Sequence, residues 1–147
     1  MKKIFLILIA IIVFTLGCEK NTLKEIYGKY SINTYTVNGS DSLGIYLDTL
    51  GPEFRFYYND VTYNKVCVIG EGLSNNGYTG QVIWVWELLE KNDIIKVLSS
   101  SGAYYGTGPI GGTITSEWEI INLTKNEFKI KTMYNNKEYF VSMKKLD

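Results

Sequence analysis

Hydrophobic and polar residues alternate along most of the chain after residue 28, in stretches rich in Tyr, Phe, Trp, Ile, Val and Thr. A period of two places successive side chains on opposite faces of a β-strand. Between Glu53 and Tyr58, for example, Phe54 and Phe56 alternate with Glu53 and Arg55. The pattern predicts an all-β chain whose eight strands are residues 29–37, 53–58, 63–70, 80–89, 93–99, 113–123, 127–134 and 138–144.

The links between these strands differ in length in a regular order. Residues 59–62, 90–92 and 124–126 are short polar links, whereas 38–52, 71–79 and 100–112 are long. Successive links of an antiparallel meander alternate between the two ends of the sheet, so the short ones gather at one end and the long ones at the other. The last link, 135–137, is short but shares the long-loop end.

An open sheet of eight strands would expose two long edges, and closure removes them. We therefore expect an eight-stranded antiparallel up-and-down β-barrel with one closed end and one long-loop end. Its inward face is predicted to carry bulky rings, which favour a mostly filled core with a shallow pocket near the open rim. These inward residues are Tyr30, Phe54, Phe56, Tyr58, Trp84, Trp86, Trp118, Phe128, Tyr134 and Tyr139.

One helical turn is predicted before the first strand. Thr22 is a suitable N-cap, Glu25 completes a capping box, and Gly28 ends the turn. No other helix is predicted, because no other stretch keeps a period of 3.6 for three turns. Residues 43–50 are assigned to a folded part of the first long loop. The alternative, a ninth strand there, would move the long loops to the end that carries the N-terminal turn.

The N-terminus has the layout of an export signal. Lys2 and Lys3 precede an apolar run from Ile4 to Leu16, which is too short for a permanent membrane span of about 20 residues. Gly17-Cys18 then resembles the cleavage site of a bacterial lipoprotein signal. The resemblance implies removal of residues 1–17 and acylation of Cys18, and two or more acyl chains hold a protein stably on a membrane. The alternative is ordinary cleavage that leaves Cys18 as a free thiol.

The domain that follows resembles a known superfamily. Gly28-Lys29-Tyr30 is similar to the Gly-x-Trp that opens the first strand of lipocalins, with Tyr30 in place of the Trp. Thr36-Val37-Asn38-Gly39, and the stretch from Trp118 to Thr124 followed by Phe128, resemble segments of small lipocalin-like lipoproteins of Bacteroidetes-type bacteria. The resemblance implies a signal peptide at 1–17, a lipidated tether at 18–27 and a lipocalin-like barrel at 28–147, with the protein anchored to the cell envelope, at the outer membrane.

Composition excludes several classes of function. The 15 Lys and Arg residues balance 15 Asp and Glu residues without a basic run, so a nucleic-acid partner is not expected. The absence of His excludes His-dependent catalytic triads and His-ligated metal sites. Cys67 lies in the apolar run Val66-Cys67-Val68-Ile69 and is predicted to be a buried, inert thiol. We expect a monomer that is not an enzyme and uses neither a metal nor a cofactor.

Aromatic residues are the remaining candidates for binding. We predict that a small apolar or aromatic ligand binds near the open end of the barrel. The alternative is a module with a filled core that binds a surface protein or a glycan through tyrosines on the loops, where large rings give contact area at little entropic cost. The candidate ligand-binding residues are Tyr46, Tyr78, Trp84, Trp86, Tyr104, Tyr105 and Trp118.

Overall fold

The computed structural model describes residues 22–77, 80–89, 93–102, 108–111 and 115–146. The predicted signal segment and Cys18 lie outside these residues, as do three of the candidate tyrosines, Tyr78, Tyr104 and Tyr105.

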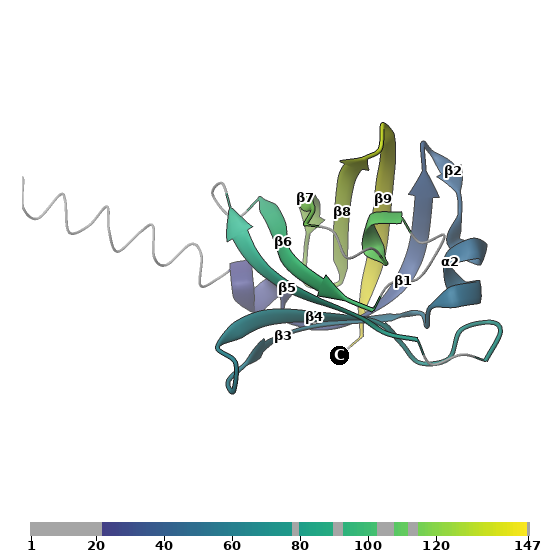
Figure 1. Ribbon diagram of the computed structural model, residues 1–147. Coiled ribbons are helices and arrows are strands. Elements are labelled where there is room, and N and C mark those ends of the chain that lie inside the picture. Colours follow the sequence, from purple (N-terminus) through teal and green to yellow (C-terminus); the bar gives the residue numbers. More distant parts are fainter. Residues whose placement is uncertain (1–21, 78–79, 90–92, 103–107, 112–114, 147) are drawn as a thin grey trace, which may run out of the picture.

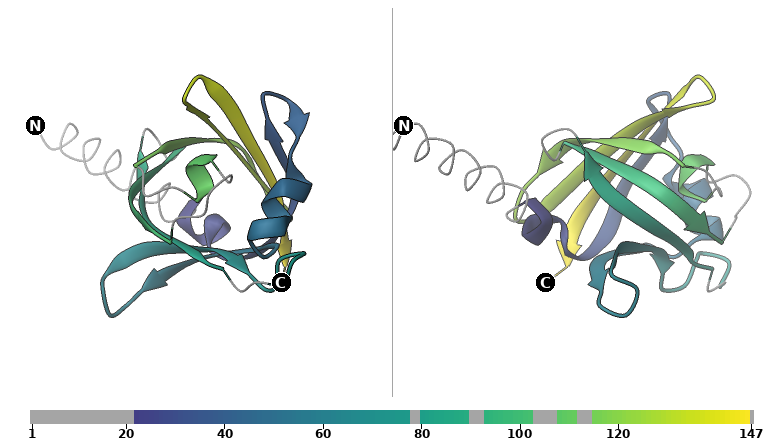
Figure 2. Two further views of the ribbon diagram at one scale, coloured as in Figure 1. Left: turned by 45° about the vertical axis from the view of Figure 1, so that its right-hand side comes forward. Right: turned by 60° about the vertical axis from the view of Figure 1, so that its left-hand side comes forward.

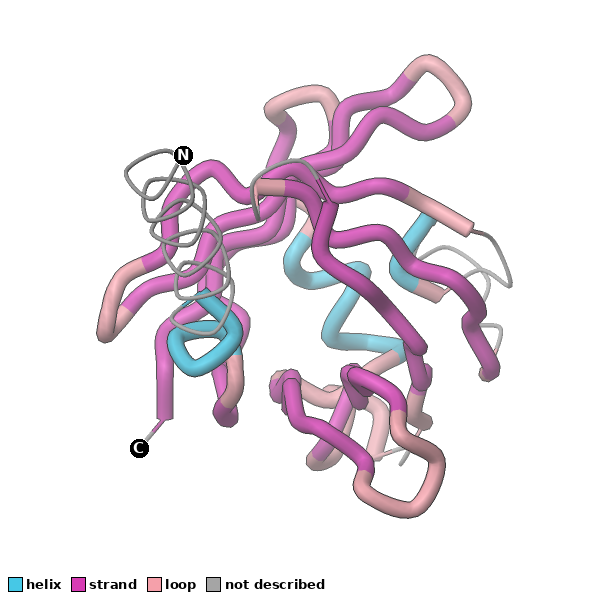
Figure 3. Tube along the Cα trace, turned by 90° about the vertical axis from the view of Figure 1, so that its left-hand side faces the viewer, coloured by secondary structure: helices cyan, strands magenta, loops and turns pink. Residues whose placement is uncertain are grey.

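The strands close into a barrel, as predicted (Figures 1 and 3). Eight of them follow one another in antiparallel order, and the last pairs with the first from Lys29↔Leu146 to Val37↔Tyr139. Tyr30 lies opposite Lys145 in this ladder. The strands are β1 (Gly28–Val37), β3 (Glu53–Asn59), β4 (Asn64–Glu71), β5 (Val82–Leu89), β6 (Ile94–Ser101), β7 (Glu117–Leu123), β8 (Glu127–Tyr134) and β9 (Lys137–Leu146), with the two-residue β2 (Ser40–Asp41) beside β1.

The two ends of the barrel differ, as the link lengths predict. A helical turn at residues 22–26 lies at the short-link end, and helix α2 (Leu43–Thr49) lies at the long-loop end (Figure 1). The N-terminal turn is fixed to the barrel by Tyr30, whose hydroxyl lies 2.9 Å from the carbonyl oxygen of Glu25 and 2.8 Å from that of Ile26. Ile26 is fully buried, so this turn closes the short-link end.

Helix α2 corrects one prediction. Residues 43–50 belong to a folded loop and not to a ninth strand, but the expectation of no second helix is wrong. Leu43, Tyr46, Leu47 and Leu50 have the i, i+3, i+4, i+7 spacing of an amphipathic helix, yet the pattern lasts only two turns. The main-chain N–H of Leu43 donates to Asp41 Oδ1 at 3.0 Å and fixes the helix start.

Aromatic side chains fill the barrel. Nearly all the predicted inward rings are buried or partly buried, which confirms the alternation on which the strands were assigned. Tyr58 is the exception, because it is 43% exposed. The ladder between β1 and β3 ends at Gly28↔Phe56, so Tyr58 lies on a part of β3 that projects past the barrel wall.

Candidate functional site

The long-loop end of the barrel is covered from within its own loops. The short helix η2 (Gly108–Ile110) places Ile110 in the core, where its carbonyl accepts a hydrogen bond of 3.2 Å from Trp84 Nε1. Tyr139 lies against Gly108, which has a φ of 58°. The segment therefore turns back into the barrel mouth, and Figure 2 shows this turn inside the ring of strands.

The three tryptophans that the sequence predicts as ligand-binding residues belong to the core. Trp84, Trp86 and Trp118 are buried and face inward, and the rings of Trp84 and Trp118 pack 5.5 Å apart. None of them is among the residues that line the two rim clefts described below. The prediction of a filled core is consistent with this packing, and these rings act as structural residues.

Tyr46 is also part of the core, which contradicts its prediction as an exposed loop tyrosine. Its side chain is fully buried, its ring stacks on Phe54 at 6.2 Å, and its hydroxyl donates to the Gly51 carbonyl at 3.3 Å. The helical spacing of α2 is the reason, since it turns Tyr46 towards the barrel. Burial raises the pKa of the Tyr46 hydroxyl well above its ordinary value.

Cys67 is the inert thiol that the sequence predicts. Its side chain is fully buried without a disulfide, and its sulfur lies 3.8 Å from the Val68 carbonyl. Burial raises the pKa of the thiol well above its ordinary value, so the reactive thiolate is disfavoured.

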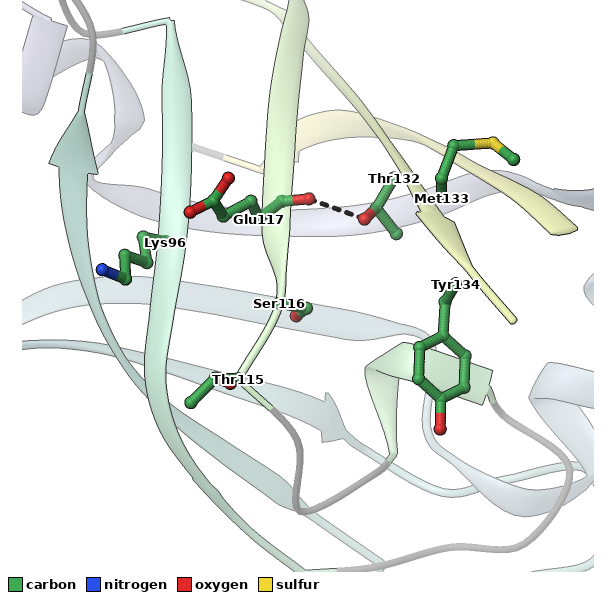
Figure 4. A pocket seen from close by; sticks show the side chains of 7 residues that line it. All are labelled: Lys96, Thr115, Ser116, Glu117, Thr132, Met133 and Tyr134. Carbon is green, nitrogen blue, oxygen red and sulfur yellow. Dashed lines mark hydrogen bonds between the residues drawn. The ribbon is translucent and has the colours of Figure 1, made fainter. Parts of the chain in front are cut away.

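The described surface has a cleft of about 460 Å³ at the rim of the barrel, between β7 and β8 (Figure 4). A second cleft of about 300 Å³ adjoins it and shares Glu117, Thr132 and Met133. The larger cleft is lined by Lys96, Thr115, Ser116, Glu117, Thr132, Met133 and Tyr134. Both strands lie at the long-loop end here, which is where a shallow pocket was expected.

The cleft exists because two neighbouring strands separate. The ladder between β7 and β8 begins at Glu119↔Lys131, whereas β8 continues with β9 as far as Tyr134↔Lys137. The last residues of β8 thus extend past the point where β7 pairs with them. A hydrogen bond connects the two strands across this separation: Thr132 Oγ1 donates to the Glu117 carbonyl at 2.6 Å.

The lining combines polar groups with an aromatic ring and a thioether. By strand alternation Ser116, Thr132 and Tyr134 belong to the inner face of the wall, whereas Glu117 and Met133 belong to the outer face. Figure 4 shows Met133 and Tyr134 pointing in different directions from β8. The cleft therefore crosses the barrel wall and offers both apolar contact and hydrogen bonds to a small ligand.

A residue that lines the cleft is hydrogen-bonded to a tryptophan of the core. Ser116 lines it and accepts a 3.0 Å hydrogen bond from Trp118 Nε1. Beside it, Lys131 and Glu119 form an ion pair of 3.1 Å on the outer face. These contacts hold the β7 side in place, so the cleft has a fixed wall next to the more projecting β8–β9 hairpin.

Sequence reasoning did not select the cleft residues for binding. The sequence predicts Tyr134 as an inward core residue and selects none of the other residues that line the cleft. The missed signal is the start of β7: the pattern predicts a strand that includes residues 115 and 116, but neither residue belongs to β7, which begins at Glu117. A shorter β7 leaves the end of β8 without its neighbour.

The comparisons with known proteins add no relative: no family model, no curated protein and no solved structure matches this chain. The fold is a closed eight-stranded antiparallel barrel, which is compatible with a lipocalin-like fold. No helix in the described part of the chain has the length and apolar character that a membrane span requires. Among the same residues, no group of three or more acidic, Cys or His side chains could hold a metal ion.

Proposed function

We propose that this protein is a lipocalin-like lipoprotein of the bacterial envelope that binds a small ligand at the rim of its barrel. The separation of β8 from β7 beyond Glu119↔Lys131 is the observation that carries the proposal, because it provides a cleft of about 460 Å³ at the long-loop end. The ligand has an apolar or aromatic part that packs on Tyr134 and Met133. It also has polar groups that bond to Ser116 and Thr132.

The anchor is the second part of the proposal. Acyl chains on Cys18 hold the protein on the outer membrane, and residues 19–21 with the helical turn connect it to the barrel. The turn lies at the short-link end (Figure 1), whereas the rim cleft is at the long-loop end, so the cleft would face away from the anchor. Mass spectrometry of the mature protein tests this part, because an unmodified Cys18 would refute it.

Calorimetric titration with indole, phenol and decanoate tests the cleft. Tyr134→Ala should weaken the binding of the best probe about tenfold, a loss near 1.4 kcal/mol. Tyr57→Ala is the control, because it removes a ring of the same size from β3, where Tyr57 lies under Arg55 and away from the cleft. Equal affinity in wild type and Tyr134→Ala would refute the cleft as the site.

A second function is favoured by the filled interior. If the barrel only supports its loops, the protein is a surface module that binds a protein or a glycan through Tyr78, Tyr104 and Tyr105. A glycan array probed with the wild type and with a Tyr104→Ala, Tyr105→Ala double variant tests this alternative. A glycan that binds both proteins equally would reject the tyrosine loops as the binding surface.

A further inference from the structure

The tip of the β3–β4 hairpin presents apolar side chains to solvent. Among the large hydrophobic residues that the structure describes, Val61 and Tyr63 are the most exposed, at 87% and 78%. Tyr58, at the end of the same hairpin, is also exposed. Val61 and Tyr63 lie in the four-residue link between β3 and β4, and together with Tyr58 they are called the apolar tip.

The backbone of this tip is held in a fixed shape. Asn59 Oδ1 accepts hydrogen bonds from the main-chain N–H groups of Val61 and Thr62, at 3.0 and 3.1 Å. Tyr63 has a φ of 56°, in the left-handed region that favours Gly or Asn over a residue with a large side chain. A residue keeps such a conformation only where the surrounding structure holds it there, as the hydrogen bonds of Asn59 do in this turn. The conformation keeps the Tyr63 ring in solvent.

The tip also projects beyond the barrel wall. The ladder between β1 and β3 ends at Gly28↔Phe56, and β3 runs on for three more residues to Asn59. At about 3.3 Å per residue, the hairpin extends about 10 Å past the start of β1. The N-terminal helical turn lies at this same end, and Figure 1 shows both features at the left of the molecule.

The chain reaches the barrel at this end through a short connection. Cys18 precedes Thr22, the first described residue, by four positions. A fully extended chain spans at most about 3.5 Å per residue, so Cys18 lies within roughly 14 Å of Thr22. Acyl chains on Cys18 would therefore bring the short-link end of the barrel to the level of the lipid headgroups.

We propose that the β3–β4 tip inserts into the headgroup region of the membrane that holds Cys18 and gives the protein a second contact with lipid. The inference rests on the anchor in the proposed function. Tyr side chains favour the boundary between headgroups and acyl chains. Lys24 on the helical turn and Lys65 beside the tip belong to the same end of the barrel, where basic residues favour anionic headgroups, and Asp60 lies in the turn between Asn59 and Val61. Two contacts fix the tilt of the barrel and turn the rim cleft away from the membrane.

A fluorescent label at the tip tests the proposal in the mature lipoprotein, reconstituted into vesicles of phosphatidylethanolamine and phosphatidylglycerol. Val61→Cys carries an environment-sensitive dye, while Cys67 is fully buried and Cys18 is acylated. Leu73→Cys, an exposed apolar position in the link after β4, is the matched control. The dye at position 61 should shift to the blue and be quenched by brominated acyl chains, whereas the dye at position 73 should be quenched by aqueous iodide.

A second variant separates the effect of the ring from that of the fold. Tyr63→Asn suits the left-handed backbone, so the variant should fold, and it should reduce the blue shift at position 61. A dye at position 61 that iodide quenches as strongly as the dye at 73 overturns the inference.

Mass spectrometry of the same sample distinguishes failure of the tip from failure of the anchor. Acylated Cys18 with a water-exposed tip overturns the insertion and leaves the anchor intact. Unmodified Cys18 overturns the anchor, and the insertion that depends on it falls as well. A blue shift that appears without vesicles, together with dimers in sedimentation, assigns the tip to a second copy of the chain and also overturns the lipid contact.

Discussion

The ammonium group of Lys145 lies 5.5 Å from the centre of the Tyr30 ring, and its Nζ donates a hydrogen bond of 3.0 Å to the Glu25 carbonyl. Tyr30 is on the first strand and Lys145 is opposite it on the last. The pair therefore joins the closing seam of the barrel to the helical turn that covers its end. A cation over an aromatic face contributes about 0.5–1 kcal/mol at a partly exposed site.

Removing the Tyr30 hydroxyl should weaken this end without opening a cavity. Tyr30→Phe removes the donor that lies close to the Glu25 and Ile26 carbonyls, and should lower the free energy of unfolding by about 1 kcal/mol. Urea denaturation followed by circular dichroism gives the value. Tyr58→Phe, on the exposed hairpin end, should change it by less than about 0.5 kcal/mol. Equal effects of the two changes would contradict the role of Tyr30.

Trp84 and Ile110 hold the loop that covers the barrel mouth. Ile110→Ala should lower the free energy of unfolding by about 2–5 kcal/mol, because Ile110 is fully buried and its loss leaves a cavity. Ile121→Ala on β7 is the control. Ile121 is 43% exposed, so this change should lower the free energy of unfolding much less. Thermal denaturation of both variants checks the prediction. A similar small loss for both would mean that η2 does not pack in the mouth.

Two glycines near α2 should respond in opposite ways to Ala. Gly44 lies within α2 and its added Cβ would meet no atom within 4 Å, so Gly44→Ala should stabilise the protein by about 0.5–1 kcal/mol. An added Cβ on Gly51 would clash with the Glu71 carbonyl oxygen, so Gly51→Ala should destabilise the protein strongly. Chemical denaturation measures both changes. A neutral Gly51→Ala would contradict the close approach of these two segments.

Buried tyrosines should make the fold sensitive to alkaline pH. Burial raises the pKa of the Tyr30, Tyr35 and Tyr46 hydroxyls above the ordinary value near 10. Above pH 10 the folded state keeps these protons while the unfolded state loses them. The contribution of the three tyrosines to the stability of the fold is therefore complete below pH 10 and falls as the pH rises above it. Tyrosinate absorbance should show that at least these three tyrosines resist titration until the chain unfolds. Full titration of the folded protein near pH 10 would contradict their burial.

The sequence predicts the barrel well because the alternation continues across almost every strand. The rings of Phe54, Phe56 and Phe128 face inward as expected. A shift of one residue in the register of a strand would turn all of its apolar side chains to solvent, so the register is strongly specified by the pattern. Helix α2 was missed because its apolar spacing covers only two turns. The pattern therefore does not indicate that Tyr46 is buried, and the structure shows that it is.

The candidate site was much less predictable. A cleft at β7 and β8 depends on where one ladder stops, and strand boundaries depend on tertiary contacts that no local pattern records. The bond from Thr132 to the Glu117 carbonyl joins residues 15 positions apart. Alternation could assign Thr132 and Tyr134 to the inner face, but it could not indicate that β7 begins too late to cover them.

Methionine methyl NMR tests the central claim, binding at the rim cleft of a filled barrel, most directly. The chain has three Met residues, and removal of the predicted signal segment leaves Met133 and Met143. Met133 lines the cleft and is 66% exposed, whereas Met143 is fully buried in the core. When indole, phenol or decanoate is added to the mature protein labelled with carbon-13 in the methionine methyl groups, the Met133 signal should shift to saturation while the Met143 signal stays constant. A saturable shift of Met143 with Met133 unchanged would place the ligand inside the barrel and contradict the account.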